Sequence, residues 1–459
     1  SEMCIRDSYG TSGSDNISSN LWRETWSSLG SGSNHTPING ELGSFYRPDG
    51  LLANSKLKWE TTISRNFGID FGFLNNRVNG SLEVYWNTTK DLLMAVPVDN
   101  TTGYSYQFQN FGKTSNRGIE LSVNVDVINK GDFRFNVGAI YNYNRNKLDE
   151  LPNADQYLYS SYWGSSSLVP TNDYMFVEGK AIGLVRGFIS EGYYTVDDFN
   201  YTNGQYVLKE GVPDITKALT ATYMHPYDLP AGQTAFPGAA KFRDVDESGT
   251  VDLDDATCLG EVMPRHTGSF QLNFNYKNFD LSTNFNWTAG GKVYNVAAMI
   301  NASGQEFDGI GAQRASWVAD AFKVYNVNAA GDLYAVTNPD ELRTLNANAK
   351  YHLPYHQSGI TSSEWLENGS YLRLQTLTLG YTLPKNWLTK VHVDKIRLYL
   401  TATNLFTITG YSGIDPEVNA NPTGQSGFYS DLRIFPTLNM DFGTYPRART
   451  FTFGANITF

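Results

Sequence analysis

The sequence predicts an all-β chain, which forms about the last ten or eleven strands of a transmembrane antiparallel β-barrel with long extracellular loops. Three observations support this prediction. Several segments alternate apolar and polar residues with a period of two, short turns alternate with long connections, and no run of about 18 apolar residues is present. A barrel strand shows this alternation because one face meets lipid and the other meets the lumen.

Composition agrees with this fold and excludes one class of partner. The 459 residues are 14% aromatic and 18% charged, and the mean hydropathy is −0.37. Lumen-facing polar residues dilute the lipid-facing ones in a barrel, so a slightly negative hydropathy is compatible with residence in a membrane. A net charge of −11 argues against a nucleic-acid partner, which needs a basic surface. Cys4 and Cys258 lie in unlike contexts and do not suggest a disulfide framework.

The first strand pairs come from 119–143 and 268–287. In the first, the tight turn 129–132 separates two alternating runs, and the second repeats this pattern around a shorter turn. Residues predicted to face lipid are Leu121, Val123, Phe135, Val137, Leu272, Phe274 and Leu281. Residues predicted to face the lumen are Asn124, Asn136, Asn273 and Asn284. A further pair lies in 371–383 and 395–406, where a phase shift between Leu374 and Leu377 predicts a β-bulge.

The last segment, TFTFGANITF, alternates without interruption. Its apolar face carries Phe451, Phe453, Ala455, Ile457 and Phe459. We expect this segment to be the barrel-closing strand, which leaves one of its edges unpaired in this chain because its partner lies in another half of the barrel. The resemblance of this strand to the last strand of outer-membrane proteins in general implies that Phe459 is part of the signal for their assembly. The alternative is that Phe459 caps the lower aromatic girdle, and both roles can coexist. The alternative is an ordinary edge strand of a soluble β-domain.

Long connections separate the strand pairs, at roughly 14–56, 97–113, 148–267, 291–369 and 409–448. Compact soluble domains seldom contain so many long loops, whereas outer-membrane barrels have short periplasmic turns and long extracellular loops. Loop aromatics such as Tyr157, Tyr159, Tyr162 and Trp163 are expected to form a girdle or pack within loops, with ligand stacking as the alternative. The first seven residues do not match this pattern and are expected to be a non-native or unrelated leader.

The strongest chemical motif is DVDESGTVDLDD at 244–255. Its oxygen donors have the spacing of a calcium-binding loop: Asp244, Asp246, Ser248, the carbonyl of Thr250, Asp252 and Asp255. Gly249 stands where such a loop turns sharply, and Val251 is expected to point inward. Ser248 replaces a carboxylate, and Asp255 is shorter than the usual glutamate. The motif predicts either a structural Ca²⁺ ion or an acidic turn held by its own hydrogen bonds.

Other metal and catalytic motifs are weak. His352 and His356 are four residues apart, but Pro354 between them disfavours the helix that would bring both onto one metal. The sequence contains no GxSxG, no Gly-rich phosphate loop and no zinc-type Cys/His pattern. The carboxylates in the loops do not single out an acid/base pair. The chain is therefore not expected to be an enzyme.

Six blocks of sequence resemble one family in the family's own order. They are 57–93 and 96–123, then FRDVDESGTVDLDDATCLG, SYLRLQTLTLGYTLP, LYLTATNLFTITGYSGIDPEVN and YPRARTFTFGANITF. From residue 8 to 459 the chain resembles the C-terminal half of the barrel of a SusC/RagA-type TonB-dependent outer-membrane transporter. That barrel has 22 strands in the family. The family's N-terminal plug and TonB box have no counterpart in this sequence, so gating and energy coupling are expected to reside outside it.

The resemblance implies a nutrient importer in the outer membrane of a Gram-negative bacterium. The implied substrate is an oligosaccharide or a peptide. The implied partners are a SusD-like surface lipoprotein, TonB through the missing N-terminal region, and outer-membrane lipid. The alternative is a soluble, secreted β-rich binding or adhesion protein with a calcium-stabilised loop. The importer and the soluble protein differ in where the apolar strand face lies. A barrel exposes this face to lipid, whereas a soluble sandwich would bury it in a core.

Overall fold

The fold was established from a computed structural model. The structure describes residues 2–14, 21–24, 26–28, 37–38, 41–42, 46–48, 51–104, 106–151, 156–161, 169–220, 225–303, 315–353, 359–388, 393–418 and 438–459. Among these residues, no helix is both long enough and apolar enough to cross a bilayer.

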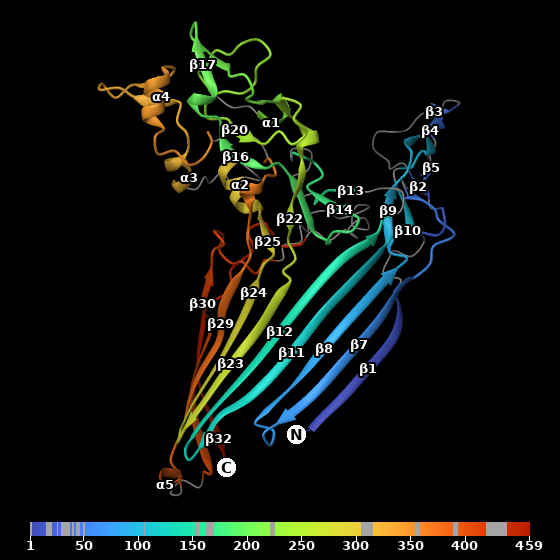
Figure 1. Ribbon diagram of the computed structural model, residues 1–459, viewed down its shortest axis with the longest axis vertical. Helices are drawn as coiled ribbons and strands as arrows, with labels where there is room; N and C mark the ends of the chain where they lie inside the picture. The colour runs from blue at the N-terminus through green and yellow to red at the C-terminus, as the bar shows by residue number, and fades with distance from the viewer. Residues whose placement is uncertain are drawn as a thin grey trace.

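A ten-stranded antiparallel sheet forms the body of the molecule (Figure 1). The strands, in their order across the sheet, are β1 (Glu2–Ser14), β7 (Glu60–Phe73), β8 (Val78–Lys90), β11 (Lys113–Lys130), β12 (Phe133–Glu150), β23 (His266–Tyr276), β24 (Phe279–Ala289), β29 (Tyr371–Thr382), β30 (Lys395–Thr409) and β32 (Thr450–Thr458). The spatial order follows the chain order, and this is the arrangement of an up-and-down barrel wall. The count of ten agrees with the sequence prediction.

Short turns join the strands at one end of the sheet, here named the turn end. Gly131 and Asp132 connect β11 to β12, and Gly131 has φ of +60°. Lys277 and Asn278 connect β23 to β24, with Lys277 at φ +51°. Positive φ at the first turn position gives a backbone twist that matches the twist of the two strands. The opposite end carries the long connections and is named the loop end (Figure 1).

The register of the sheet separates apolar from polar side chains. Residues that lie directly opposite each other in an antiparallel sheet point to the same face. One row across seven strands consists of Ile128, Phe135, Phe274, Leu281, Leu379, Leu400 and Phe453. The neighbouring row, on the other face, consists of Asp126, Asn136, Asn273, Ser282, Thr378, Thr401 and Thr452. The sheet therefore has one apolar face and one polar face, as the alternation predicts.

Hydrogen bonds run sideways along the polar row. The Asn136 amide donates to Asp126 Oδ1 at 3.0 Å, and Ser282 Oγ donates to Asn273 Oδ1 at 2.6 Å. On the opposite face, the rings of Phe135 and Phe274 stack with centroids 4.3 Å apart. Side-chain hydrogen bonds therefore link the strands on the polar face, and ring contacts link them on the apolar face.

The apolar face is not the core of the protein. The seven residues predicted to face lipid are all half-buried, and none belongs to a buried hydrophobic cluster among the described residues. The four asparagines predicted to face the lumen lie on the polar face, for example Asn284 opposite Gln271. An apolar face that stays uncovered over many strands is typical of a membrane barrel rather than of a sandwich.

The predicted β-bulge is confirmed in β29. Asn284 pairs with Thr376 while the next residue, Phe285, pairs with Leu374, so Gln375 is the extra residue. The same irregularity appears in the pairing of β29 with β30. The bulge restores the apolar face after the phase shift, and Leu374 and Leu377 both remain on that face. Gln375 instead accepts a hydrogen bond from the Asn286 amide at 2.6 Å.

Residues 2–7 continue β1 and pair with β7 in register. Arg6 forms ion pairs with Asp70 at 2.8 Å and with Glu83 at 2.9 Å. These contacts show how the segment is placed, but strand pairing does not reveal its origin. The expectation of a non-native or unrelated leader over residues 1–7 therefore stays a prediction.

The long connections span 15–59, 91–112, 151–265, 290–370 and 410–449 and carry short elements of their own. Their strands are β2 (Trp26–Ser28), β3 (Pro37–Ile38), β4 (Glu41–Leu42), β5 (Tyr46–Pro48), β6 (Leu51–Leu52), β9 (Leu93–Pro97), β10 (Tyr106–Asn110), β13 (Gln156–Tyr159), β14 (Tyr174–Val177), β15 (Leu184–Gly187), β16 (Ser190–Tyr193), β17 (Phe199–Thr202), β18 (Gln205–Leu208), β19 (Asp214–Ile215), β20 (Ala240–Phe242), β21 (Thr250–Val251), β22 (Thr257–Glu261), β25 (Lys292–Asn295), β26 (Tyr325–Val327), β27 (Leu333–Ala335), β28 (Leu366–Asn368) and β31 (Met440–Asp441). The helical segments are α1 (Lys217–Thr220), α2 (Val296–Ser303), α3 (Ala315–Asp320), α4 (Pro339–Leu345), α5 (Lys385–Leu388) and the 3₁₀ turns η1 (Asn100–Thr102), η3 (Val196–Asp198), η4 (Leu253–Asp255) and η5 (Ser363–Trp365). All of these helical segments except α5 belong to the long connections; α5 lies at the turn end, between β29 and β30 (Figure 1).

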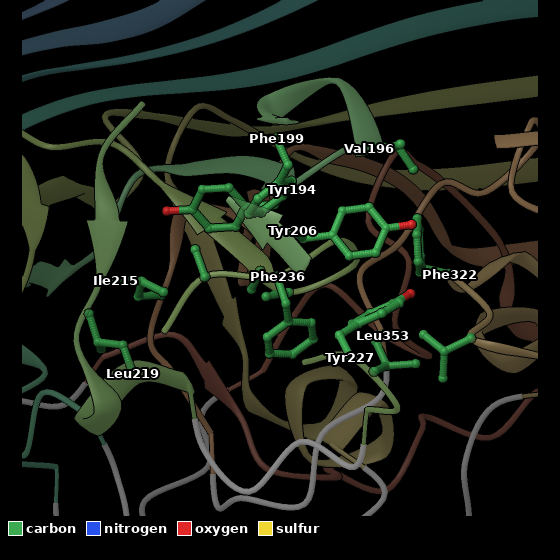
Figure 2. Packing of buried hydrophobic residues seen from close by; sticks show 14 of the residues in the cluster. Tyr194, Val196, Phe199, Tyr206, Ile215, Leu219, Tyr227, Phe236, Phe322 and Leu353 are labelled. Atoms are coloured by element: carbon green, nitrogen blue, oxygen red, sulfur yellow. The ribbon is translucent and has the colours of Figure 1, made fainter. Parts of the chain in front are cut away.

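The buried cores of the protein lie in these connections. One cluster joins α2, α3 and η5 to β14 and contains Tyr174, Tyr294 and Met299. A second cluster is built mainly from 188–251 and 322–360, and Figure 2 shows its rings packed around Tyr206 and Phe236. The long connections thus form a packed structure at the loop end instead of separate, extended loops.

A buried ion-pair network ties one connection to the barrel wall. Arg373 in β29 is 2% exposed and donates to Asp415 Oδ1 at 2.5 Å and to Glu417 Oε2 at 2.9 Å. Arg447 also pairs with Glu417, at 2.8 Å. A buried arginine needs such partners because an uncompensated charge in a low-dielectric site is costly. The segment around residue 415 is therefore fixed against the top of β29.

Candidate functional site

The predicted calcium loop is a turn that leads from β20 into η4. Gly249 has φ of +87°, which an L side chain rarely adopts, and Val251 is fully buried in the second loop cluster. Val251 also pairs in parallel with Ile215 of β19. The sharp turn and the inward anchor that the motif predicts are both present.

Backbone amides organise the first two carboxylates. Asp244 accepts hydrogen bonds from the amides of Ser248 at 3.1 Å and Gly249 at 2.7 Å. Asp246 accepts from the amide of Ser248 at 3.0 Å, and the hydrogen bonds from Ser248 lower the pKa of Asp246 below its usual value. The ionised form is favoured because donors face it.

Asp255 closes the loop from inside. Its side chain is fully buried and accepts from the amides of Val245 at 2.5 Å and Asp252 at 2.8 Å. Asp252 accepts from the amide of Asp254 at 2.8 Å and so caps η4. A capping residue of this kind fixes the direction in which the next turn leaves the loop.

Three of the six predicted ligands converge. Oxygen atoms of Asp244, Asp246 and Asp255 all lie within 4.8 Å of one another, and no other such acidic or histidine-containing group occurs among the residues that the structure describes. Ser248 and Thr250 instead bond to each other, Ser248 Oγ donating to the Thr250 carbonyl at 3.0 Å, while Asp252 caps η4. Three carboxylate groups suit a hard cation such as Ca²⁺. Whether an ion binds there stays a prediction.

The two histidines do not form a described metal site. His352 is buried, and its Nδ1 lies 2.8 Å from the Leu353 carbonyl oxygen. Burial lowers the pKa of His352 to about 4, so the ring is neutral at neutral pH. His356 lies outside the described residues.

The described loop aromatics pack within the loops. Tyr159 is 4% exposed, and its ring centroid lies 4.7 Å from that of Phe176. Phe108 is 1% exposed and is the centre of a small cluster near Leu57. Tyr162 and Trp163 lie outside the described residues. For Tyr159, the expectation of loop packing is confirmed over ligand stacking, and Phe108 packs within the loops in the same way.

A small cavity at the loop end did not emerge from the sequence. It has a volume of about 160 Å³, and its lining includes Trp317, Tyr351, Glu364, Trp365, Glu367 and Ser412. These residues come from α3, η5, β28 and two connecting segments. They lie up to a hundred positions apart without a spacing motif, so only the folded loops bring them together. No local signal would have found this cavity.

The two carboxylates of the cavity differ in their partners. Glu367 accepts from the amide of Ser412 at 2.7 Å and from the Asn295 side chain at 2.7 Å. Glu364 lies 4.0 Å from His352 Nε2, between carboxylate oxygen and ring nitrogen. Burial raises the pKa of Glu364 to about 7. The lining that the structure describes includes no lysine or arginine.

The terminal strand β32 forms one edge of the ten-stranded sheet. It pairs with β30 alone among the described strands, and β1 forms the other edge. The apolar side chains of this segment are largely exposed: Phe451 65%, Phe453 74%, Ile457 51% and Phe459 86%. The unpaired edge agrees with the expectation for a barrel-closing strand. The role of Phe459 in assembly stays a prediction.

Comparison with known proteins places this architecture in a family. Residues 8–405 match the family described as TonB dependent receptor-like, beta-barrel. The chain is 30% identical to TonB-dependent receptor P3 of Formosa agariphila over 455 residues, which is 99% of this chain and 39% of that protein. It is 26% identical to TonB-dependent receptor SusC of Bacteroides thetaiotaomicron, over 88% of this chain and 32% of that protein.

The fold is also found among solved structures. The RagAB peptide transporter matches with a TM-score of 0.66 and 21% identity, over 100% of this chain and 41% of that chain. The RagAB peptide importer in its open-open state matches with a TM-score of 0.65 and 22% identity, over 100% of this chain and 40% of that chain. This chain therefore spans about a third to two fifths of the length of these relatives.

These findings decide between the two readings of the sequence. Receptors of this family are outer-membrane β-barrels of Gram-negative bacteria and are not enzymes, which excludes the soluble, secreted alternative. The uncovered apolar face of the sheet is accordingly the lipid face, and the asparagine-rich face lines the barrel lumen. The chain belongs to the TonB-dependent receptor family and forms part of its outer-membrane β-barrel.

Proposed function

We propose that this chain is the C-terminal part of the barrel of a TonB-dependent nutrient importer that takes up an oligosaccharide or a peptide together with a SusD-like surface lipoprotein. The observation that carries the proposal is similarity over nearly the whole chain to receptors of one kind, including SusC. The likeness of the fold to the RagAB peptide transporter is in keeping with a peptide as well. Energy for uptake comes from TonB, which acts on the part of the protein outside this chain.

The structure fits this role in two ways. The polar face of the sheet offers amide and hydroxyl groups across seven strands, which suits a water-filled lumen for polar nutrients. The packed connections at the loop end form a broad structure above the barrel (Figure 1). This loop end is where the proposed lipoprotein would dock as a lid.

Growth of the native bacterium tests the proposal. Deletion of the full-length gene is expected to abolish growth on one oligosaccharide or peptide mixture as the sole carbon source, and the intact gene is expected to restore it. Growth on the matching monosaccharide or free amino acids is the control, because small nutrients pass through general porins. A deletion strain that grows normally on every polymer tested would contradict an importer. Purification of the tagged protein from the outer membrane without any surface lipoprotein would contradict the proposed partner.

We also propose that the 244–255 loop binds one structural Ca²⁺ ion. The convergence of Asp244, Asp246 and Asp255 around the Gly249 turn supports it. Calorimetry on the full-length protein should show calcium heat that the Asp244→Asn variant lacks. Asp340→Asn is the matched control, since Asp340 is an exposed carboxylate in α4 outside the loop. Equal heats for all three proteins, or none at millimolar calcium, would leave an acidic turn held by hydrogen bonds.

A further inference from the structure

The cavity of about 160 Å³ at the loop end has walls of two chemical kinds. Trp317 stacks on Tyr351 with ring centroids 3.9 Å apart, and the ring of Trp365 lies 5.2 Å from that of Trp317. Together with two alanines of α2, these rings make an apolar wall with electron-rich faces. The remaining wall is acidic and contains Glu364 and Glu367.

The polar groups on the described walls differ in how far they are already hydrogen-bonded within the protein. Ser412 donates its hydroxyl to Glu367 Oε1 at 2.7 Å, and Glu367 also accepts from Asn295, so this corner serves the protein itself. The indole nitrogen of Trp317 is out of solvent reach. Glu364 is the other carboxyl group of the acidic wall, and among the described residues it forms one recorded ion-pair contact, with Nε2 of the buried His352 at 4.0 Å.

His352 does not neutralise Glu364. Burial lowers the pKa of His352 to about 4, and its Nδ1 is engaged by the Leu353 carbonyl at 2.8 Å. The ring is therefore uncharged at neutral pH. Tyr351 and Glu367 also line the cavity, and neither side chain can carry a positive charge. Among the described residues, no cation balances Glu364 in this cavity.

A cationic group on a ligand would complement both the acidic wall and the aromatic wall of the cavity. An ammonium group donates three hydrogen bonds and accepts none, which matches a wall that offers acceptors. A cation is also attracted to the faces of indole rings, most strongly when water is excluded. A neutral sugar needs donors as well as acceptors from the wall, and the described walls supply few free donors.

We propose that this cavity binds a primary ammonium group of the imported substrate, such as a lysine side chain, with Glu364 as the counter-ion and the rings of Trp317 and Trp365 as the surrounding walls. This proposal rests on the proposed importer function, since it names a chemical group of the substrate. A lysine-containing peptide is the simplest ligand that presents such a group on a flexible apolar stem.

Binding to the full-length protein in detergent tests the proposal with defined probes. The first probe is the tripeptide Ala-Lys-Ala with blocked ends, and the second replaces lysine with norleucine, which keeps the apolar stem and removes the charge. Maltotriose is the neutral sugar probe. We expect the lysine peptide to bind at least about tenfold more tightly than the norleucine peptide, and Glu364→Gln to abolish this preference.

Controls separate loss of charge from loss of fold. Glu210→Gln removes an exposed carboxylate outside the cavity and should leave the preference unchanged. Trp365→Phe keeps a ring and should weaken lysine-peptide binding by less than Trp365→Ala does. The heat-dependent gel mobility of each variant shows whether its barrel is intact.

Several outcomes would overturn the proposal. Equal affinity for the lysine and norleucine peptides, a preference that survives Glu364→Gln, or no binding of either peptide would each do so. Maltotriose binding that Glu364→Gln weakens, without any preference for lysine, would make the cavity a neutral saccharide site instead. Failure of the importer function looks different: the lysine preference would persist in purified protein, while deletion of the gene would leave growth on every polymer unchanged.

Discussion

At the scale of single residues, the most informative pair is His352 and Glu364. Burial favours the neutral form of both groups, lowering the pKa of His352 to about 4 and raising that of Glu364 to about 7. The two atoms that face each other are 4.0 Å apart. At this distance the two groups would form an ion pair if both were charged. The lowered pKa of His352 and the raised pKa of Glu364 each favour the neutral form instead. The pair is therefore a buried neutral contact at mildly acidic pH.

The pair has opposite effects on stability as the pH changes. For His352 the folded pKa lies below the unfolded value, so its contribution is lost as the pH falls from about 6.5 to about 4. For Glu364 the folded pKa lies above the unfolded value, so its contribution is lost as the pH rises from about 4.5 to about 7. Between pH 4.5 and 6.5 the two slopes oppose each other in the wild-type protein.

Replacing one residue of the pair should reveal how the stability contribution of the other residue depends on pH. In Glu364→Gln the local stability is expected to rise from pH 4.5 to 6.5, and in His352→Gln it is expected to fall, each by on the order of 2 kcal/mol. Hydrogen exchange of the amides in 351–353 and 363–366, corrected for intrinsic rates, measures this stability in the full-length protein. Slopes of the same sign in both variants would contradict the assigned pKa shifts.

At the scale of elements, the strands follow from local rules and the loops do not. Alternation with a period of two is a local property, so the sequence alone predicted both faces of β11, β12, β23 and β24. The phase shift near Leu374 likewise predicted the bulge at Gln375. The short strands and cores of the loop end depend on contacts over long stretches of chain, such as Tyr294 against Tyr174. Local patterns therefore could not predict them.

The same contrast explains which parts of the candidate sites were predictable. The turn at Gly249 and the inward position of Val251 are properties of one twelve-residue motif, and both are present. The convergence of Asp244, Asp246 and Asp255 follows from the same motif, whereas Asp252 is drawn to the start of η4, where it caps the turn. The cavity around Glu364 is built from distant parts of two long connections, 290–370 and 410–449, so no local motif predicted it.

The two faces of β11 allow a matched test of membrane orientation. Val123 lies on the apolar face opposite Ala139, and its neighbour Asn124 lies on the polar face opposite Gly138. Val123→Arg is expected to reduce stability by roughly 2 to 4 kcal/mol if the residue lies near the bilayer midplane, because an arginine there must leave water for lipid. Asn124→Arg, one position away, should change stability far less because its side chain enters the lumen.

Unfolding by denaturant in lipid vesicles measures both variants of the full-length barrel. Retention of heat-dependent gel mobility before unfolding confirms that each variant has inserted. Equal losses in the two variants, or a larger loss for Asn124→Arg, would reverse the assignment of the faces.

At the scale of the whole molecule, the sheet has two edges that the described strands leave open. β1 and β32 each pair on one side only, and their apolar side chains are exposed, for example Met3 66% and Phe453 74%. In lipid an open edge leaves backbone donors and acceptors without partners, and this is why membrane sheets close into barrels. The relatives in the family are more than twice as long, so the strands that complete the wall lie in their remaining length.

The open edges lead to a prediction about this chain when it is produced alone. Refolded in detergent without the rest of the protein, residues 1–459 are expected to aggregate through the edges of β1 and β32, because unpaired strand edges recruit further strands. The full-length protein, treated in the same way, should yield a monomer with heat-dependent gel mobility. Sedimentation measures the size of each product, and circular dichroism shows whether both contain strands. A monomeric, heat-modifiable product from residues 1–459 alone would mean that β1 and β32 pair with each other and that ten strands suffice to close a barrel. That result would contradict the open wall seen here.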